Sequence, residues 1–361
     1  MNSRETIRNV WRVAGAIAAI GVILTSTAHA QVPPEIAAQL RAIGTGVCVP
    51  ETAKIYRPLQ PTAPYPGVTI MRDISYAPDP RTIMDVFAPE KGGGNRPVLI
   101  YVSGGAGDKI VSGPDGAAFY DNIMLWAVKN GMTGVNMQRR GGFGGGLAWD
   151  EPAKDVGLVV DWVRQNITKY KGNPNRIFLW ADSAGNGPVS TYAAHPEISG
   201  AGGAAVKGIV LMSSPNFNIL PETVPATPRG SPAPSAGGAL GTNCGRAAGE
   251  ARGGRQGGGG PGRGIPAGGA PAPVDPATQL ARSNLPGLAN GKIAVFLGWG
   301  ELDPPNILTF DETLKNALCK AGRCPTTAFF KDHSHVSLVF SPNTADNSVT
   351  GPILKWMKSV K

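Results

Sequence analysis

One serine stands in a sequence context that can turn a hydroxyl into a nucleophile. Ser183 lies in the segment 180–186, with the small residues Ala181 and Gly185 two positions before and after it. The apolar run before it predicts a strand, and the segment after it can begin a helix. Such a sharp strand-to-helix turn exposes the hydroxyl to a base and aims helix amides at a developing oxyanion. The pattern also arises by chance in a chain with 50 glycines, so partners elsewhere must support it.

An acid and a histidine follow this serine in the chain. Asp303 lies on a loop after the predicted strand 293–298, and His335 follows the predicted strand 326–330. Imidazole can accept the serine proton and return it to the leaving group, while a carboxylate fixes the imidazole tautomer. Taken singly, Asp303 could cap the helix that follows it, and His335 could be a surface loop histidine. Their order at the ends of separate strands favours a Ser-His-Asp triad.

A glycine loop follows a buried strand upstream of the serine. The predicted strand 97–102 leads into the loop 103–107, which contains three glycines. Glycines let the backbone approach a substrate oxygen closely, with free amides pointing at it. Phosphate binding is the alternative for such a loop, but neither a Gly-Lys-Ser/Thr sequence nor a G-x-G-x-x-G helix opening follows. The loop is therefore predicted to supply oxyanion donors.

These motifs resemble the α/β-hydrolase superfamily, and within it the esterase and lipase branch related to hormone-sensitive lipase. Residues 181–185 are similar to the G-D-S-A-G of that branch, and residues 103–106 stand at its H-G-G-G position. Together with residues 300–305, the resemblance covers 68–361 apart from one insertion. It implies an α/β-hydrolase fold, with a mostly parallel central sheet, helices on both faces and a Gly/Pro-rich insertion.

The resemblance also implies the role of each site residue. Ser183 is the expected nucleophile, Asp303 the acid and His335 the base. The amides of Gly104, Gly105 and Ala184 form the expected oxyanion hole. Two positions depart from the family pattern: Ser103 replaces the histidine that braces the glycine loop, and Ala181 replaces the first glycine of the turn.

Two histidines compete for the role of base. His333 and His335 can face the same way in an extended segment, so periodicity does not separate them. We prefer His335, which holds the family position before a segment that can start a helix. The pair could also bind a metal, but the sequence holds no further ligand cluster, so neither metal nor cofactor is expected. His195, after the helix that follows the serine, is expected on the surface.

Strand and helix patterns alternate over 68–361, the predicted catalytic domain. Apolar side chains at helical spacing between the strands predict a largely parallel sheet covered on both faces. Residues 31–67 are expected to form an N-terminal extension. The predicted strands are an opening pair at 68–76 and 82–88, then 98–102, 133–138, 177–181, 209–212, 293–297 and 326–330.

The first thirty residues are typical of an export signal. Three arginines precede an apolar stretch at 13–24, and Ala28-His29-Ala30 fits a cleavage site. The stretch is short for a membrane helix, so a cleaved signal peptide at 1–30 is predicted rather than an uncleaved anchor. We therefore expect a periplasmic or secreted protein without stable membrane insertion. The net charge of +9 identifies no partner.

Residues 221–276 differ in composition from the rest of the chain. They contain almost no large apolar residues, and their glycine-rich runs cannot bury a core. We expect a flexible insertion, placed where it could act as a lid over the site. One alternative is a surface excursion without catalytic effect. The other is a glycine–arginine segment that binds RNA, which export disfavours, so no nucleic-acid partner is expected.

Four cysteines in an exported chain permit two disulfides. Cys319 and Cys324 are near neighbours across a helix-ending turn and are predicted to pair, which leaves Cys48 to pair with Cys244. A zinc site is the alternative, but the spacing does not repeat a two-residue gap.

The sequence as a whole predicts an exported serine hydrolase that cleaves small-molecule carboxylic esters through an acyl-enzyme. The same machinery can cleave amides, so an amidase, arylformamidase or peptidase is the nearest alternative. A noncatalytic binding protein with the hydrolase fold belongs to a different class and is suggested by the two departures from the family pattern.

Overall fold

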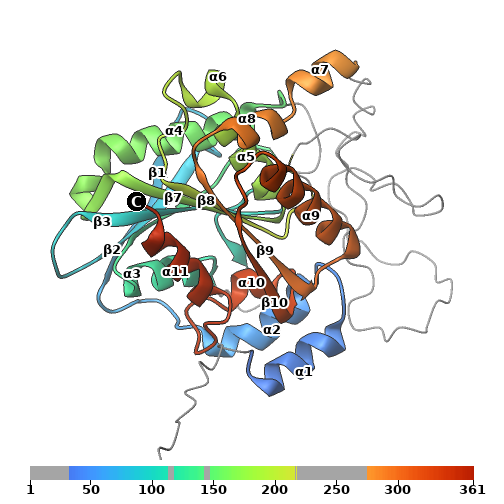
Figure 1. Ribbon diagram of the computed structural model, residues 1–361. Helices are drawn as coiled ribbons and strands as arrows, with labels where there is room; N and C mark the ends of the chain where they lie inside the picture. The colour runs from blue at the N-terminus through green and yellow to red at the C-terminus, as the bar shows by residue number, and fades with distance from the viewer. Residues whose placement is uncertain (1–31, 113–117, 142–146, 216, 218–274) are drawn as a thin grey trace, which may run out of the picture.

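An eight-stranded sheet forms the centre of the computed structural model (Figure 1). The structure describes residues 32–112, 118–141, 147–215, 217 and 275–361. The strands of this sheet are β1 (Val68–Ser75), β2 (Ile83–Pro89), β3 (Arg96–Val102), β6 (Thr133–Met137), β7 (Gly172–Asp182), β8 (Gly208–Met212), β9 (Ala294–Leu302) and β10 (Thr326–Ser334). A separate two-stranded ribbon pairs β4 (Val111–Ser112) with β5 (Ala118–Phe119).

The sheet is parallel from its third strand onward. Its order is β1-β2-β6-β3-β7-β8-β9-β10. β2 is antiparallel to both β1 and β6, and every later pair is parallel. The carboxyl ends of β3, β7, β8, β9 and β10 therefore meet along one edge of the sheet. The predicted strands and their mostly parallel arrangement are confirmed.

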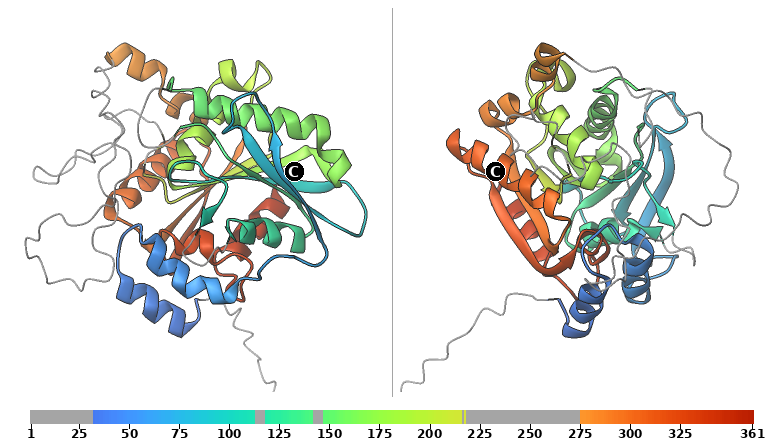
Figure 2. Two further views of the ribbon diagram at one scale, coloured as in Figure 1. Left: turned by 180° about the vertical axis from the view of Figure 1, so that it is seen from behind. Right: turned by 90° about the vertical axis from the view of Figure 1, so that its right-hand side faces the viewer.

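Helices cover both faces of the sheet, because strand side chains alternate between two apolar layers. Along β3, Leu99 and Tyr101 enter one layer, whereas Val98, Ile100 and Val102 enter the other. The helices are α1 (Pro34–Ile43), α2 (Val49–Tyr56), α3 (Asp121–Lys129), α4 (Glu151–Asn166), α5 (Asn186–Ala194), α6 (Pro196–Ser199), α7 (Pro276–Ala281), α8 (Leu285–Asn290), α9 (Pro305–Lys320), α10 (Ser337–Phe340) and α11 (Thr350–Ser359), with 3-10 turns η1 (Arg57–Leu59), η2 (Ile167–Tyr170) and η3 (Ser183–Gly185). The first layer holds α1, α2, α3, α10 and α11, and the second holds α4, α5, α8 and α9 (Figures 1 and 2).

The described part of the N-terminal extension is built into the first layer. Ile36 and Leu40 of α1 are buried in the same apolar cluster as Phe340 of α10. α1 packs against β10 and α2 against α10, as Figure 2 shows for the blue helices beside the red ones. Arg41 adds an ion pair to Asp332 on β10. The extension therefore supports the strand that leads to His335.

Several predictions fall wholly or partly outside the described residues. These are the signal peptide at 1–30, Cys244, and the insertion at 221–276 apart from its last two residues, Asp275 and Pro276. α7 begins at Pro276, and the Asp275 side chain caps it by accepting a bond from the Thr278 amide at 3.0 Å. Within the described ranges, no helix combines the length and apolar character needed to cross a bilayer.

One of the two predicted disulfides lies wholly within the described residues and is confirmed. Cys319 and Cys324 form a disulfide at the end of α9, as predicted. Cys48 is also disulfide-bonded. Its predicted partner, Cys244, is not among the described residues.

The expectation that His195 lies on the surface is wrong. His195 is only 6% exposed. Its Nε2 lies 3.0 Å from Asn284 Oδ1, its Nδ1 lies 2.9 Å from Glu197 Oε1, and its ring packs against Trp149. Asn284, which directly precedes α8, and Trp149, which lies before α4, are distant from His195 in the chain, so local sequence could not reveal the burial.

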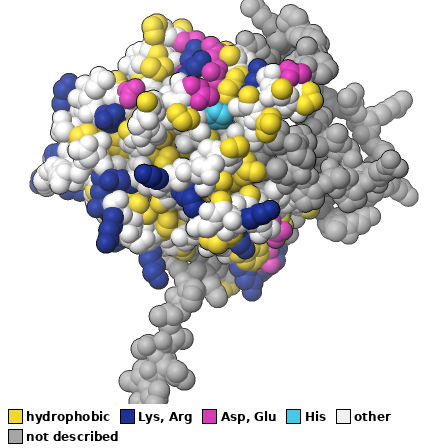
Figure 3. Space-filling model, turned by 45° about the horizontal axis from the view of Figure 1, so that its top comes forward, with side chains coloured by type: hydrophobic (Ala, Val, Ile, Leu, Met, Phe, Trp, Pro, Cys, Tyr) yellow, Lys and Arg dark blue, Asp and Glu magenta, His cyan; other side chains and the backbone are white. Residues whose placement is uncertain are grey.

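Charged side chains are dispersed over the face of the molecule drawn in Figure 3. Lys and Arg side chains stand apart from one another among apolar and uncharged ones, and acidic side chains gather toward the upper edge. On this face the positive charge is therefore spread rather than concentrated in one band.

His333 ties the end of β10 to the following chain. Its ring is fully buried, with Nδ1 2.9 Å from Ser337 Oγ and Nε2 2.7 Å from Ser348 Oγ. Asp346 lies 3.5 Å from the same Nε2. Burial lowers the pKa of His333 to about 4 from its ordinary 6.5, and the carboxylates of Asp346, Asp332 and Asp303 only partly offset this effect.

We predict that the free energy of unfolding falls as the pH drops from about 6.5 to about 4. In this window the unfolded chain takes up a proton on His333 that the folded protein excludes, which favours unfolding. The folded state therefore has the full contribution of neutral His333 to its stability only above the unfolded pKa. Urea unfolding at a series of pH values, in the wild type and in His333→Asn, measures the effect. The variant lacks the titrating group, and its stability should fall less steeply. Equal slopes for the two proteins would show that His333 is not responsible.

Candidate active site

Ser183 stands on a strained turn between β7 and α5. It follows the last residue of β7, begins the turn η3 and has a left-handed φ of 47°. A non-glycine residue in this region costs of order 1–3 kcal/mol, which the surrounding structure must offset. Asn186 contributes by donating to the Ser183 carbonyl at 2.8 Å and to the Met212 carbonyl at 2.7 Å. The turn is thereby fastened to the end of β8.

Gly185 allows the turn to sit close to its neighbour in the sheet. A Cβ at this position would lie 2.2 Å from the Val102 carbonyl oxygen on β3. Gly104 is similarly tight, since a Cβ there would lie 2.7 Å from Ser183 Cβ. The glycine loop after β3 and the serine after β7 are therefore in direct contact.

Asp303 and His335 form a buried pair at the ends of β9 and β10. The exposed fractions of these residues are 2% and 5%. His335 Nδ1 donates to Asp303 Oδ1 at 2.8 Å. The other carboxylate oxygen accepts bonds from the Gly300 amide at 2.7 Å and from the Ser213 hydroxyl. Asp303 does not cap α9, whose N-terminal cap residue is Pro304 without a side-chain cap bond.

The environment of His335 strengthens it as a base. Burial lowers the pKa of the imidazole, but the hydrogen bond and charge of Asp303, together with the charge of Asp182, outweigh this and raise the pKa above its ordinary 6.5. Asp182, one of these two carboxylates, directly precedes Ser183 in the chain. His333 makes no such pair with Asp303, since both of its ring nitrogens face serine hydroxyls.

The second ring nitrogen of His335 is without a partner. Nε2 is buried and makes no hydrogen bond, so Ser183 Oγ and His335 Nε2 are not bonded in this structure. In hydrolases without substrate this contact is often long and tightens when substrate binds. An imidazole fixed at Nδ1 with a free Nε2 is the arrangement that a general base requires.

The glycine loop offers a different set of amides from the one that the sequence predicted. The Gly104 amide is already engaged, because it donates to Asp182 Oδ1 at 3.0 Å. By contrast, the amides of Gly105, Ala106 and Ala184 donate to no acceptor in the described part of the chain. Of the three expected donors, Gly104 is thus already bonded, whereas Gly105 and Ala184 are free to donate within the described part of the chain, as is Ala106.

Sequence reasoning did not single out three polar residues that build this site. Asp182 accepts bonds from the Gly104 amide and from the Tyr101 hydroxyl, Ser213 supports Asp303, and Asn186 holds the serine turn. Ser213 directly follows β8, and its position at a strand end was the one available signal. Among the described residues, no group of three or more His, Cys, Asp or Glu side chains is arranged to hold a metal ion.

The family model that matches this chain covers the part that carries the serine. The model of the carboxylesterase family matches residues 83–220, which include the glycine loop and Ser183 but neither Asp303 nor His335. Human cocaine esterase is 33% identical over 114 residues, or 30% of this chain and 20% of that protein. Para-nitrobenzyl esterase of Bacillus subtilis (strain 168) is 29% identical over 149 residues, or 37% of this chain and 30% of that protein. The chain thus spans under a third of these relatives.

Solved structures match over much more of the chain. Esterase B from Lactobacillus rhamnosis has a TM-score of 0.58 at 14% identity, covering 90% of this chain and 96% of that one. A thermostable esterase from Pseudomonas putida ECU1011 has a TM-score of 0.57 at 14% identity, covering 91% and 98%. These likenesses show the fold, and placement in the branch related to hormone-sensitive lipase stays a prediction. The chain therefore has the α/β-hydrolase fold of these esterases, and over residues 83–220 it is similar to the carboxylesterase family.

Proposed function

We propose that this protein hydrolyses carboxylic esters through an acyl-enzyme formed on Ser183. The observation that carries the proposal is the buried Asp303–His335 pair at 2.8 Å, whose imidazole keeps Nε2 unpartnered. The contact between the glycine loop and the serine turn supports it. The match of residues 83–220 to the carboxylesterase family adds independent support for the nucleophile and the loop.

In the first half of the reaction, His335 Nε2 takes the proton of the Ser183 hydroxyl as the oxygen attacks the ester carbonyl. The tetrahedral intermediate carries a negative oxygen, which accepts hydrogen bonds from the amides of Gly105, Ala106 and Ala184. The imidazolium then gives its proton to the departing alcohol, leaving an acyl ester on the serine. Asp303 stabilises the positive imidazole throughout without taking its proton.

The second half repeats this chemistry with water in place of the serine. His335 removes a proton from water, which attacks the acyl carbonyl and forms a second oxyanion at the same amides. Collapse of this intermediate releases the carboxylic acid and returns the proton to Ser183. Apart from the ester and one water molecule, neither half needs a further reactant. The names of the relatives, such as para-nitrobenzyl esterase and cocaine esterase, suggest small organic esters as the substrate class.

Export to the periplasm or medium forms a further part of the proposal. It rests on the basic and apolar pattern of residues 1–30 and agrees with the Cys319–Cys324 disulfide, because disulfides persist in oxidising compartments. Amino-terminal sequencing of the protein from an expressing host tests this. The mature chain should begin at Gln31, and an intact Met1 on a cytoplasmic product would contradict export.

Replacing the nucleophile should abolish turnover without disturbing the fold. We predict that Ser183→Ala lowers kcat on a short-chain p-nitrophenyl ester by at least about 1000-fold, because the triad acts as a unit. The variant should also lose covalent labelling by a fluorophosphonate.

A second buried serine on the helix that follows the turn provides the control. Ser190 is fully buried on α5, and its hydroxyl has no hydrogen-bond partner in the described part of the chain. Ser190→Ala should keep both turnover and labelling. Ser183→Ala with full esterase activity would refute the proposed function.

A further inference from the structure

Every carbonyl oxygen of the glycine loop and the two residues after it accepts a hydrogen bond. The donors come from three other parts of the chain as well as from the loop itself. Arg139 Nη2 donates to Ser103 O and Gly105 O at 3.3 Å each, Gly107 N to Gly104 O at 2.9 Å, Arg81 Nη2 to Ala106 O at 3.1 Å, Arg139 N to Gly107 O at 3.0 Å, Ser103 Oγ to Asp108 O at 2.7 Å, and Asn136 Nδ2 to Lys109 O at 2.6 Å.

Two amides of the same loop, unlike its carbonyls, make no hydrogen bond within the described part of the chain. The Gly105 and Ala106 amides donate to nothing in the described part of the chain, although they lie in a loop whose carbonyls are all engaged. A peptide group is rigid, so a carbonyl held from one side fixes the amide that points to the other. The Gly104 carbonyl, held by the Gly107 amide, shares a peptide with the Gly105 amide. The Gly105 carbonyl, held by Arg139, shares a peptide with the Ala106 amide. These two bonds therefore set the direction of the amides that would bind an oxyanion.

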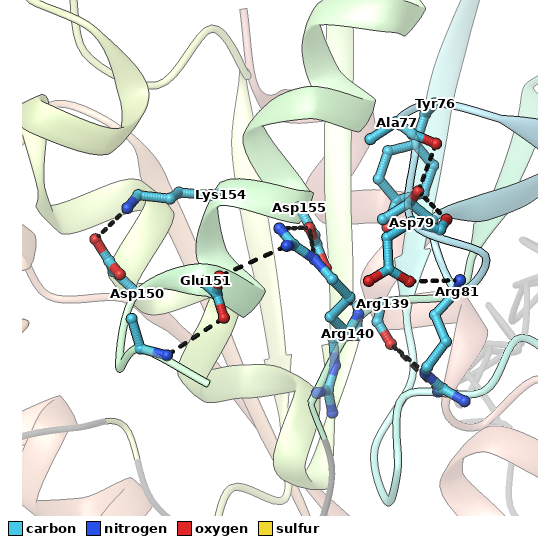
Figure 4. Close-up of polar contacts among 12 residues, drawn as sticks. Tyr76, Ala77, Asp79, Arg81, Arg139, Arg140, Asp150, Glu151, Lys154 and Asp155 are labelled. Carbon is cyan, nitrogen blue, oxygen red and sulfur yellow. Dashed lines mark hydrogen bonds and ion pairs between the residues drawn. The ribbon is translucent and has the colours of Figure 1, made fainter. Parts of the chain in front are cut away.

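Arg139 lies directly behind the loop. It is only 3% exposed, and a Cβ on Gly107 would lie 2.5 Å from its Cγ. One guanidinium nitrogen serves both Ser103 O and Gly105 O, while the Arg139 amide serves Gly107 O. Arg81 adds a contact from the outer edge, and Figure 4 shows its guanidinium at the Arg139 backbone.

The charge of Arg139 also opposes an unfavourable neighbour. Asp182 accepts the Gly104 amide, and a carboxylate so close to the loop would repel a developing oxyanion. Burial raises the pKa of Asp182, whereas the Tyr101 hydroxyl, the charge of His335, the Gly104 amide and the charge of Arg139 act in the other direction. A guanidinium stays protonated in proteins, so Arg139 supplies a permanent positive charge on this side of the loop.

We propose that Arg139 is a positioning residue for oxyanion stabilisation, holding the Gly105 carbonyl so that the Ala106 amide of the same peptide faces the reacting centre beside the Gly105 amide. The inference rests on the proposed ester hydrolysis. Ser103, where the resembling family has a histidine, contributes one bond from its hydroxyl to Asp108 O, and Arg139 holds the carbonyls of Ser103 and Gly105.

The adjacent arginine offers a matched control. Arg140 is turned toward α4, as Figure 4 shows, and pairs with Asp155 at 2.7 Å and Glu151 at 3.6 Å. It makes no bond to the glycine loop among the described contacts. Removing Arg140 therefore takes away a guanidinium and its ion pairs at the neighbouring position without touching the carbonyls of residues 103–107.

The test compares Arg139→Gln, Arg139→Lys and Arg140→Gln, each as the full mature chain. Two readouts are kcat and KM on a p-nitrophenyl ester. The third is the inhibition constant of a trifluoromethyl ketone, whose serine adduct carries an oxyanion.

Arg139→Gln should lower kcat by about 10- to 1000-fold with KM nearly unchanged, and should weaken inhibition in proportion to the loss in kcat/KM. Arg139→Lys should recover part of the lost kcat and part of the lost inhibition, because one ammonium can donate to two carbonyls. Arg140→Gln should lower the melting temperature while keeping kcat and inhibition near wild type.

Unchanged kcat and inhibition in a folded Arg139→Gln protein would overturn the inference. If that variant does not fold, Arg81→Gln applies the same test from a side chain that is 41% exposed. A several-fold loss in kcat with constant KM would support the inference, and unchanged kinetics would overturn it. The proposed function is judged separately, because it fails only if Ser183→Ala remains active.

Discussion

The buried hydrogen bond between Asp303 and His335 is the interaction on which the proposed chemistry depends. Neither group is stable inside a protein without partners, since removing one member of a buried pair typically costs about 3–5 kcal/mol. Asp303 meets this demand with three donors: the His335 ring, the Gly300 amide and the Ser213 hydroxyl. The result is an imidazole with a raised pKa, held in one tautomer with its other nitrogen unpartnered.

The parallel sheet makes this pair possible. Five neighbouring strands end along one edge, and each delivers a different part of the site: the glycine loop after β3, Ser183 after β7, Ser213 after β8, Asp303 after β9 and His335 after β10. The side chains project from irregular backbone, and two of them, Ser183 and Ser213, lie in left-handed conformations. Asn186 and the carbonyl contacts of the loop hold these segments in place, so rigidity comes from hydrogen bonds that cross between strand ends.

Local patterns in the sequence were sufficient for the strands and for the order of the site residues. Short, mostly apolar runs mark most of the strands, and strand ends are where parallel sheets gather loops, so Ser183, Asp303 and His335 could be placed at one edge. Longer-range contacts could not be foreseen. The Gly104 amide is engaged by Asp182, His195 contacts Asn284, and α1 packs against β10, all through partners far away in the chain. The role of Arg139 was hidden for the same reason, because its side chain bonds to backbone carbonyls that carry no sequence signature.

The most direct measurement is a crystal structure of the protein after reaction with an alkyl phosphonate ester, which mimics the tetrahedral intermediate. The account predicts phosphorus bonded to Ser183 Oγ, one phosphoryl oxygen within hydrogen-bond distance of the Gly105, Ala106 and Ala184 amides, and His335 Nε2 facing the leaving-group side. Phosphorus on another residue, or a phosphoryl oxygen turned away from these amides, would contradict it.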